Sequence, residues 1–129
     1  MEIITANIQW IMLASGVLTL TMLQPVFAPR SAIKAFFGEE ISGPAAALVV
    51  RNWGFLIVVS AAFLIYAAFH ADLRVPALIV SGAGKLCFVG LVFANGGRYA
   101  KNQVFIAAII DAVWILLFAL YLVAELGAA

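Results

Sequence analysis

The chain has 129 residues, of which 67% are hydrophobic and 10% are charged, and its mean hydropathy is +1.18. This composition lies outside the range of soluble globular domains. The sequence therefore predicts an integral membrane protein with a single transmembrane domain over residues 1–129. The net charge of +1, with no basic stripe and no zinc-finger spacing, argues against a nucleic-acid partner.

Four apolar stretches divide the chain, and each is close to the roughly 20 residues that a helix needs to cross a bilayer. They cover residues 8–28, 45–69, 76–94 and 103–124. Short segments rich in Gly, Pro and charged residues separate them, and these residue types mark helix ends. Because lipid cannot satisfy backbone hydrogen-bonding groups, stretches of this kind are expected to be helical. The predicted fold is all-α, an integral membrane four-helix bundle with up-down topology.

The first stretch also has one feature of a signal peptide, since small residues end at Ala28, where a signal peptidase would cut. Its flanks favour an uncleaved helix, because no Lys or Arg precedes Arg30 and Pro29 would directly follow the cut. We therefore expect the first stretch to remain as a transmembrane helix.

Basic residues are distributed unevenly over the three connections. The first and third connections hold Arg30, Lys34, Arg98 and Lys101, Arg51 follows the first connection, and the second connection holds only Arg74. Lys and Arg near helix ends resist translocation, so this bias places the first and third connections in the cytoplasm. We expect a multi-pass protein of the cell membrane, in a bacterium the inner membrane, with both termini periplasmic and the lipid bilayer as its surroundings.

The first connection contains an amphipathic segment, residues 31–37. On a helix, Ile33, Phe36 and Phe37 share one side, whereas Arg30 and Lys34 lie toward the other. Such a segment lies flat, with its apolar side in the acyl boundary and its basic side on anionic headgroups. It predicts a short interfacial helix after the first transmembrane helix, acting either as a membrane-edge anchor or as a docking surface or gate.

Two ionisable residues, Lys85 and Asp111, lie inside the third and fourth apolar stretches. If the intervening turn is centred near Tyr99, Lys85 precedes it by about 14 residues and Asp111 follows by about 12, or roughly 21 and 18 Å along a helix. Helices joined by a short loop are usually antiparallel neighbours, so the two side chains can meet. A charge in the hydrocarbon core costs several kcal/mol unless it is paired or wetted. Lys85 and Asp111 therefore predict an intramembrane polar cluster.

Arg51 and Asn52 open the second apolar stretch and are candidates for the same cluster. Arg51 either extends outward to the headgroup region along its long stem or points inward toward Asp111. Gly54, one helical turn further on, would allow another helix to pack closely there.

The Lys85–Asp111 pair allows two roles. A desolvated ion pair can fix the register of two helices, often without adding net stability. Alternatively, a carboxylate that exchanges a lysine partner for a proton can couple proton movement to transport. The first role is favoured, because no chain of Asp, Glu or His continues from the pair to the other side of the membrane.

Catalytic and metal sites are not indicated. The single histidine, His70, cannot form a multi-histidine metal or haem site. The isolated serines of the apolar stretches have no adjacent base, and the single cysteine, Cys87, is expected to be a small buried residue. We expect no enzyme activity, no cofactor and no metal.

The general plan of the chain resembles the DoxX-like group of small bacterial membrane proteins. The resemblance lies in four short helices, a first connection with Pro29 and the run Phe36-Phe37-Gly38-Glu39, and Arg51 near the start of the second helix. It implies a small integral membrane protein of the bacterial cytoplasmic membrane, and it implies no functional residues.

These observations predict a non-enzymatic membrane protein that acts by contact, as an accessory subunit of a membrane complex or as a homo-oligomer. Small residues on several helix faces, including Gly84 and Gly90, offer more close-packing surface than one bundle needs. The alternative is a small proton-coupled transporter or channel that uses the Lys85–Asp111 pair.

Overall fold

The computed structural model describes residues 2–127, and every regular element in this range is a helix. The elements are α1 (Glu2–Ala6), α2 (Ile8–Thr19), η1 (Leu20–Met22), α3 (Leu23–Phe27), α4 (Pro29–Phe37), α5 (Pro44–Ala68), η2 (Ala71–Leu73), α6 (Arg74–Ala94) and α7 (Gln103–Gly127). Four stretches are long and apolar enough to cross a membrane, namely Ile8–Phe27, Pro44–Ala68, Ala71–Ala94 and Gln103–Gly127. The prediction of an all-helical chain with four candidate spans is confirmed.

Prolines lie in the first turn of three of the helices. Pro29 and Pro44 occupy the first turns of α4 and α5, where a missing N–H costs no helical hydrogen bond. The helix α6 was predicted to begin at Pro76, but it begins at Arg74, because proline is equally tolerated within the first turn. The helix that was predicted to be interfacial, α4, ends before Gly38, which adopts a left-handed φ of 71°.

The sequence predicted one regular helix for the first span, but the structure shows an interrupted one. It changes at η1 into a tighter 3₁₀ turn and resumes as α3. Pro25 lacks the N–H that would bond to the carbonyl of Thr21, and its ring would crowd that carbonyl. The turn before Pro25 therefore tightens, and the hydroxyl of Thr21 donates to the carbonyl oxygen of Leu18 at 2.8 Å.

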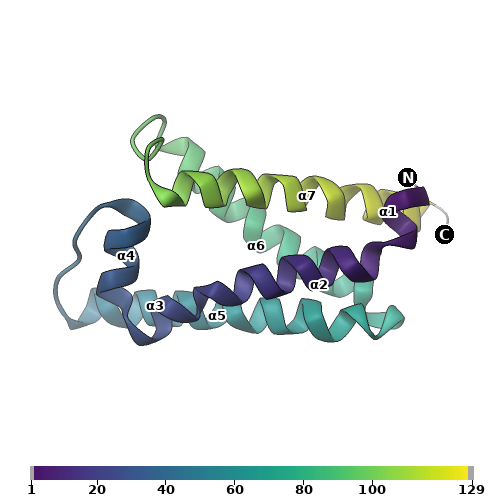
Figure 1. The fold of residues 1–129 in the computed structure, drawn as a ribbon, viewed down its shortest axis with the longest axis horizontal. Coiled ribbons are helices and arrows are strands. Elements are labelled where there is room, and N and C mark those ends of the chain that lie inside the picture. Colours follow the sequence, from purple (N-terminus) through teal and green to yellow (C-terminus); the bar gives the residue numbers. More distant parts are fainter. Residues whose placement is uncertain (1, 128–129) are drawn as a thin grey trace.

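The helices are arranged as two pairs (Figure 1). The first pair consists of α2 and α3 packed along α5, and the second of α6 packed along α7. Glycines allow the close approach within the first pair: a Cβ on Gly16 would lie 3.1 Å from the carbonyl oxygen of Ala61, and one on Gly54 would lie 3.0 Å from Cβ of Pro25. The expected close packing at Gly54 is thus present, against the kinked part of the first span.

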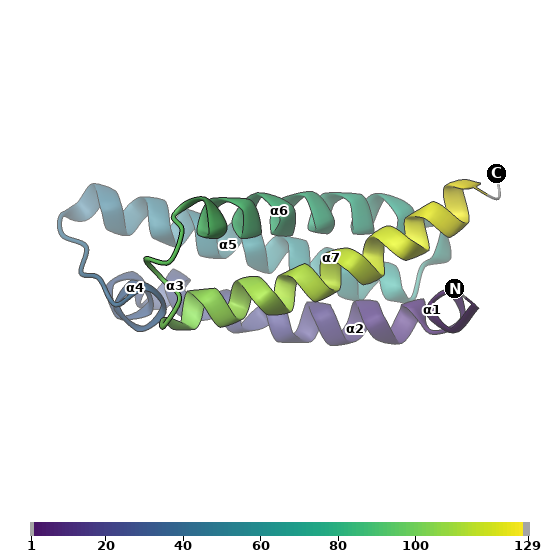
Figure 2. The same ribbon diagram turned by 90° about the horizontal axis from the view of Figure 1, so that it is seen from above.

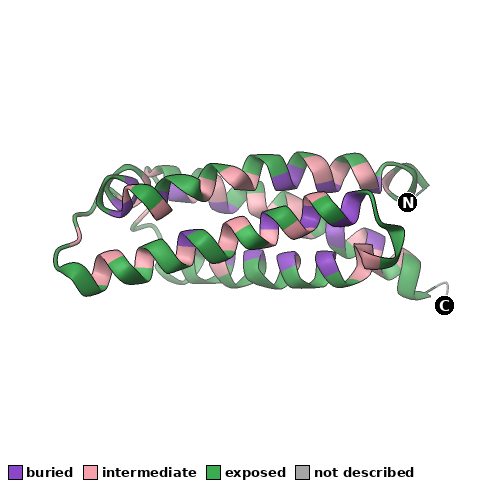
Figure 3. Cartoon of the chain, turned by 90° about the horizontal axis from the view of Figure 1, so that it is seen from below, coloured by how far each residue is buried: buried purple, intermediate pink, exposed green. Residues whose placement is uncertain are grey.

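The buried side chains form two separate cores, of which the first contains residues of both helix pairs and the second lies within the α6–α7 pair. The terminal core lies at the end of the molecule that carries both termini (Figure 2), and the α4-side core lies near the opposite end. The terminal core contains Ile8, Met12, Leu64, Ala67, Ala68, Ala77, Leu78, Phe118 and Tyr121. The α4-side core contains Val89, Val92, Val104 and Ala108, with Phe36 and Phe37 of α4 packed against it. Buried residues line the inner faces of the helices, whereas their outer faces are exposed (Figure 3).

Outside the spans, the loop after α4 is tied to the connection between α6 and α7. Arg98 donates to Oε1 of Glu39 at 2.6 Å, and the hydroxyl of Tyr99 donates to the same oxygen at 3.2 Å. The rings of Phe37 and Tyr99 meet edge to face with centroids 5.2 Å apart. We call these contacts of Phe37, Glu39, Arg98 and Tyr99 the loop latch, since they hold α4 against the second helix pair.

Candidate functional site

Lys85 of α6 and Asp111 of α7 meet between the two cores. Lys85 Nζ lies 2.9 Å from Asp111 Oδ1, and the side chains are 7% and 21% exposed. The short distance makes this a charge-assisted hydrogen bond, stronger than one between neutral groups. The two charges cancel, so the site is polar but has no net charge.

Thr19 of α2 connects the Lys85–Asp111 ion pair to the first helix pair. Its hydroxyl accepts a hydrogen bond from Lys85 Nζ at 3.2 Å and donates one to the carbonyl oxygen of Ser15 at 2.7 Å. The single hydroxyl proton is therefore used toward Ser15, which leaves the oxygen lone pairs for the ammonium group. The lysine thus bonds to both helix pairs at once.

Sequence reasoning missed Thr19, although a usable signal was present. Thr19 lies about eight residues before the end of the first span, Lys85 about nine before the end of α6, and Asp111 about eight after the start of α7, or ~12–14 Å in each case. Testing every polar residue of the other spans for matching depth would have selected it.

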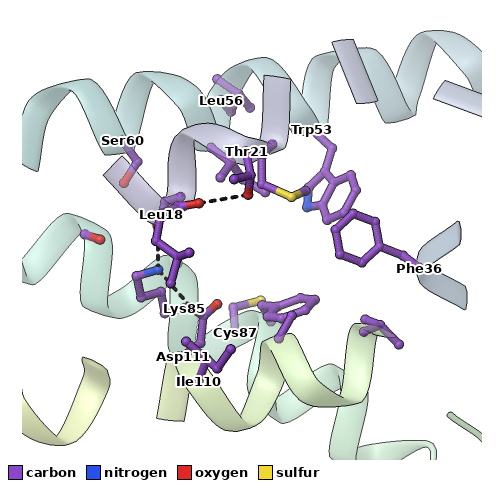
Figure 4. A pocket seen from close by; sticks show the side chains of 18 of the residues that line it. Leu18, Thr21, Phe36, Trp53, Leu56, Ser60, Lys85, Cys87, Ile110 and Asp111 are labelled. Carbon is purple, nitrogen blue, oxygen red and sulfur yellow. Dashed lines mark hydrogen bonds and ion pairs between the residues drawn. The ribbon is translucent and has the colours of Figure 1, made fainter. Parts of the chain in front are cut away.

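A cavity of about 510 Å³ adjoins this polar cluster, between the two helix pairs (Figure 4). Its lining residues come from both pairs and from α4, and they are Leu18, Thr19, Thr21, Met22, Phe36, Trp53, Leu56, Ile57, Ser60, Ser81, Gly84, Lys85, Cys87, Phe88, Leu91, Val104, Ala107, Ile110 and Asp111. Most of these side chains are apolar, and the only charged groups are those of the ion pair. The volume is in the range of about 300–1,000 Å³ typical of small-molecule sites.

The cavity is not closed off from the outer surface of the helices. Leu56 is 58% exposed and Leu91 is 63% exposed, although both contribute to its lining. These residues lie in candidate spans, where the outer surface is apolar. The cavity therefore opens sideways, between the helices, onto a surface that suits lipid.

The cluster has hydrogen-bonding capacity that the protein does not use. An ammonium group has three N–H donors, and within residues 2–127 Lys85 uses two of them, toward Thr19 and Asp111. Asp111 accepts through Oδ1, while Oδ2 has no hydrogen-bond partner among the described side chains and backbone groups. One donor of Lys85 and one acceptor of Asp111 therefore remain without a protein partner, on two residues that line the cavity.

The structure does not bring Arg51 and Asn52 to this cluster. Both are exposed, and neither lines the cavity. The cavity face of α5 carries Trp53, Ile57 and Ser60, at the helical spacing that places them on one side. Arg51 is two positions from Trp53 and so points to roughly the opposite side of α5, which agrees with the outward alternative.

Helix α4 has the sidedness expected from its sequence. Ile33 is buried, Phe36 and Phe37 are half-buried, and Arg30 and Lys34 are exposed. Phe36 reaches the cavity beside Trp53 (Figure 4).

The hydrogen bond from Arg98 lowers the pKa of Glu39 in the loop latch below its ordinary value, and the charge of Arg98 acts in the same direction. At neutral pH the latch is therefore in its ionised form.

The prediction that Cys87 is buried is wrong, because its side chain is exposed and forms part of the cavity wall. Its apolar neighbours in sequence suggested burial, but in a small bundle half of an apolar helix faces outward. His70 lies at the end of the second span, with its ring stacked on Tyr66 at a centroid distance of 4.0 Å.

Comparison of the chain with known protein families, with curated proteins and with solved structures gives no match. The resemblance to DoxX-like proteins therefore stays an expectation from the sequence, and the function has to be argued from the site itself.

Proposed function

We propose that this chain is a non-catalytic integral membrane protein that acts by contact, and that it does so by holding a lipid-soluble molecule in the cavity between its helix pairs. The observation that carries this proposal is the position of the ion pair. Lys85 and Asp111 lie on the wall of a cavity of about 510 Å³ rather than in a closed packing interface. A pair needed only for helix register would be better served by a filled interior.

The arrangement of the cores supports the same role. The terminal core packs the two helix pairs together at one end, whereas the α4-side core lies within the α6–α7 pair and contacts α4. The middle of the bundle is then left less tightly packed, and Thr19 and Lys85 make the polar contact across it. A sideways opening onto the apolar outer surface would let a molecule dissolved in the membrane enter without crossing water.

The proposal places the chain in a membrane as an up-down bundle with both termini on the non-cytoplasmic side, which in a bacterium is the periplasm of the inner membrane. The distribution of basic residues supports it. In a Cys87→Ser background, Ser42→Cys and Ala71→Cys introduce exposed thiols in the first and second connections. A membrane-impermeant maleimide should label Ala71→Cys in intact cells and Ser42→Cys only after permeabilisation, and the reverse result would invert the orientation.

The occupant can be detected with a small apolar aryl diazirine in lipid nanodiscs. Photolabelling should be saturable at Met22 and Trp53, which line the cavity. Gly84 also lines it, and a Cβ added there meets no atom within 4 Å, so Gly84→Leu should add volume at the cavity wall without a clash at Cβ. Gly90→Leu is the matched control on the same helix, because Gly90 is equally open but lies outside the cavity. Labelling that is unaffected by Gly84→Leu would refute the proposal.

The protein is further proposed to work as an accessory subunit or a homo-oligomer, since the small residues Gly82, Ala83 and Ala119 line an open hollow between α6 and α7 where another helix could pack closely. The mass of the particle extracted in a mild detergent separates these possibilities. Comigration with a large assembly indicates an accessory subunit, and a small multiple of 13.7 kDa indicates a homo-oligomer.

A proton-coupled carrier is the second candidate, and the partial exposure of Asp111 toward the cavity favours it. In this role the carboxylate would exchange Lys85 for a proton as cargo passes. Reconstituted Asp111→Asn protein would then fold and lose pH-dependent flux, whereas a binding protein shows no flux in either form.

A further inference from the structure

The unused hydrogen-bonding groups beside the cavity specify the kind of molecule that fits it. This step rests on the proposed function, because it assumes that the cavity is occupied. The polar cluster offers one N–H of Lys85 and the Oδ2 of Asp111, both unpaired among the described residues, on a largely apolar wall that also carries the hydroxyls of Ser60 and Ser81. We propose that the occupant is an uncharged amphiphile whose head both donates and accepts hydrogen bonds, such as a long-chain alcohol or a monoacylglycerol.

The charge balance of the site argues against ionised heads. Lys85 and Asp111 neutralise each other, so an added carboxylate would lie near the charge of Asp111 and an added ammonium near that of Lys85. Either one would bring an uncompensated charge into a low-dielectric site, which is costly. A neutral head brings no such charge.

The two free groups select among neutral heads. A hydroxyl can accept from Lys85 and donate to Asp111 Oδ2, and so completes both. A ketone can only accept, and it leaves the carboxylate oxygen unpaired. A hydrocarbon satisfies neither group. The order of affinity expected from the site is therefore alcohol, then ketone, then alkane.

The rest of the cavity suits an aliphatic chain. The lining between the polar cluster and the outer surface is formed largely by Leu, Ile, Val and Phe side chains, and it opens beside Leu56 and Leu91. The hydroxyl of Thr21 donates to its own helix and does not need a ligand. A head at Lys85 and Asp111 can thus be followed by a tail that leaves the bundle sideways into the membrane.

Competition against the apolar diazirine tests this order in nanodiscs. The competitors are dodecan-1-ol, dodecan-2-one, dodecane, dodecanoate and dodecylammonium, compared at equal mole fraction in the bilayer. We expect dodecan-1-ol to displace the probe from Met22 about tenfold more effectively than dodecane, equivalent to about 1.4 kcal/mol. We expect the ketone to fall between them and both ions to compete no better than the alkane.

The double variant Lys85→Met/Asp111→Leu identifies the source of the selectivity. It removes both ionisable groups at the cavity wall, while Thr19 keeps its hydrogen bond to Ser15, and it should bind the alcohol and the alkane equally well. The Gly90→Leu protein should keep the wild-type order. If dodecane competes as well as dodecan-1-ol in the wild-type protein, or if either ion competes best, the proposed ligand class is wrong although the cavity still binds. If no competitor displaces the probe, the proposed function fails as well.

Discussion

Replacing Asp111 by asparagine tests the account of the ion pair, because the variant removes the charge but almost no volume. At the observed Nζ–Oδ1 separation of 2.9 Å, two unit charges attract each other by about 6 kcal/mol at an effective dielectric constant of about 20. Part of this attraction is recovered when the surroundings relax, and removing one partner of a buried pair costs about 3–5 kcal/mol. Since Asp111 is 21% exposed, we expect a loss near the lower limit, about 3 kcal/mol of unfolding free energy.

The unfolding free energy can be measured by titrating sodium dodecyl sulfate into protein held in mild detergent micelles. The double variant Lys85→Met/Asp111→Leu is the matched control, because it removes both charges and fills the space with apolar side chains. It should recover most of the loss. The reasoning is refuted if Asp111→Asn unfolds within about 0.5 kcal/mol of the wild type, the range of ordinary surface substitutions, or if the double variant is as unstable as the single one.

Three further outcomes follow from individual contacts. Thr19→Val removes the acceptor for Lys85 and should lower the unfolding free energy by about 1 kcal/mol, a typical value for a hydrogen bond between membrane helices. Thr19→Ser keeps the hydroxyl and should stay near the wild type. Equal losses in the two variants would mean that packing, not the hydroxyl, stabilises the protein here. Gly54→Ala should cost about 1–3 kcal/mol through overpacking, because its Cβ would lie 3.0 Å from Cβ of Pro25, while Gly90→Ala, which meets nothing within 4 Å, should cost nothing in the same titration. Glu39→Gln should weaken the loop latch at neutral pH. The pKa of Glu39 is lowered by Arg98, so the latch contributes stability above the ordinary glutamate pKa of about 4.3 and loses it as the pH falls through the lowered pKa. The difference between the variant and the wild type should therefore shrink as the pH falls below the ordinary glutamate pKa, and a difference that does not change in acid would contradict the assignment.

The helices and the depth of the charged residues could be predicted from the sequence, because both follow from local rules. Apolar stretches of bilayer length are helical whatever surrounds them, and residue counts along a helix give depth. The contact between Lys85 and Asp111 needed only those counts and a short connection. The sidedness of α4 followed in the same way from its helical period.

Features that depend on how each helix is rotated about its own axis could not be predicted from the sequence. The direction of Arg51 is set by which face of α5 meets the other helices, and the apolar sequence around it is too uniform to mark that face. The same uniformity hid the exposure of Cys87. The cavity arises from the separation of two cores and from the 3₁₀ turn before Pro25, neither of which has a sequence pattern of its own.

The most direct test of the central claim is the mass of the native particle, measured by mass spectrometry after mild extraction of the protein from its own membrane. The wild type and the Gly90→Leu variant are predicted to carry a small bound molecule that the Gly84→Leu variant lacks, because only Gly84 lines the cavity. Identical bound masses in all three proteins, or no bound molecule in the wild type, would contradict the claim that this cavity is a binding site.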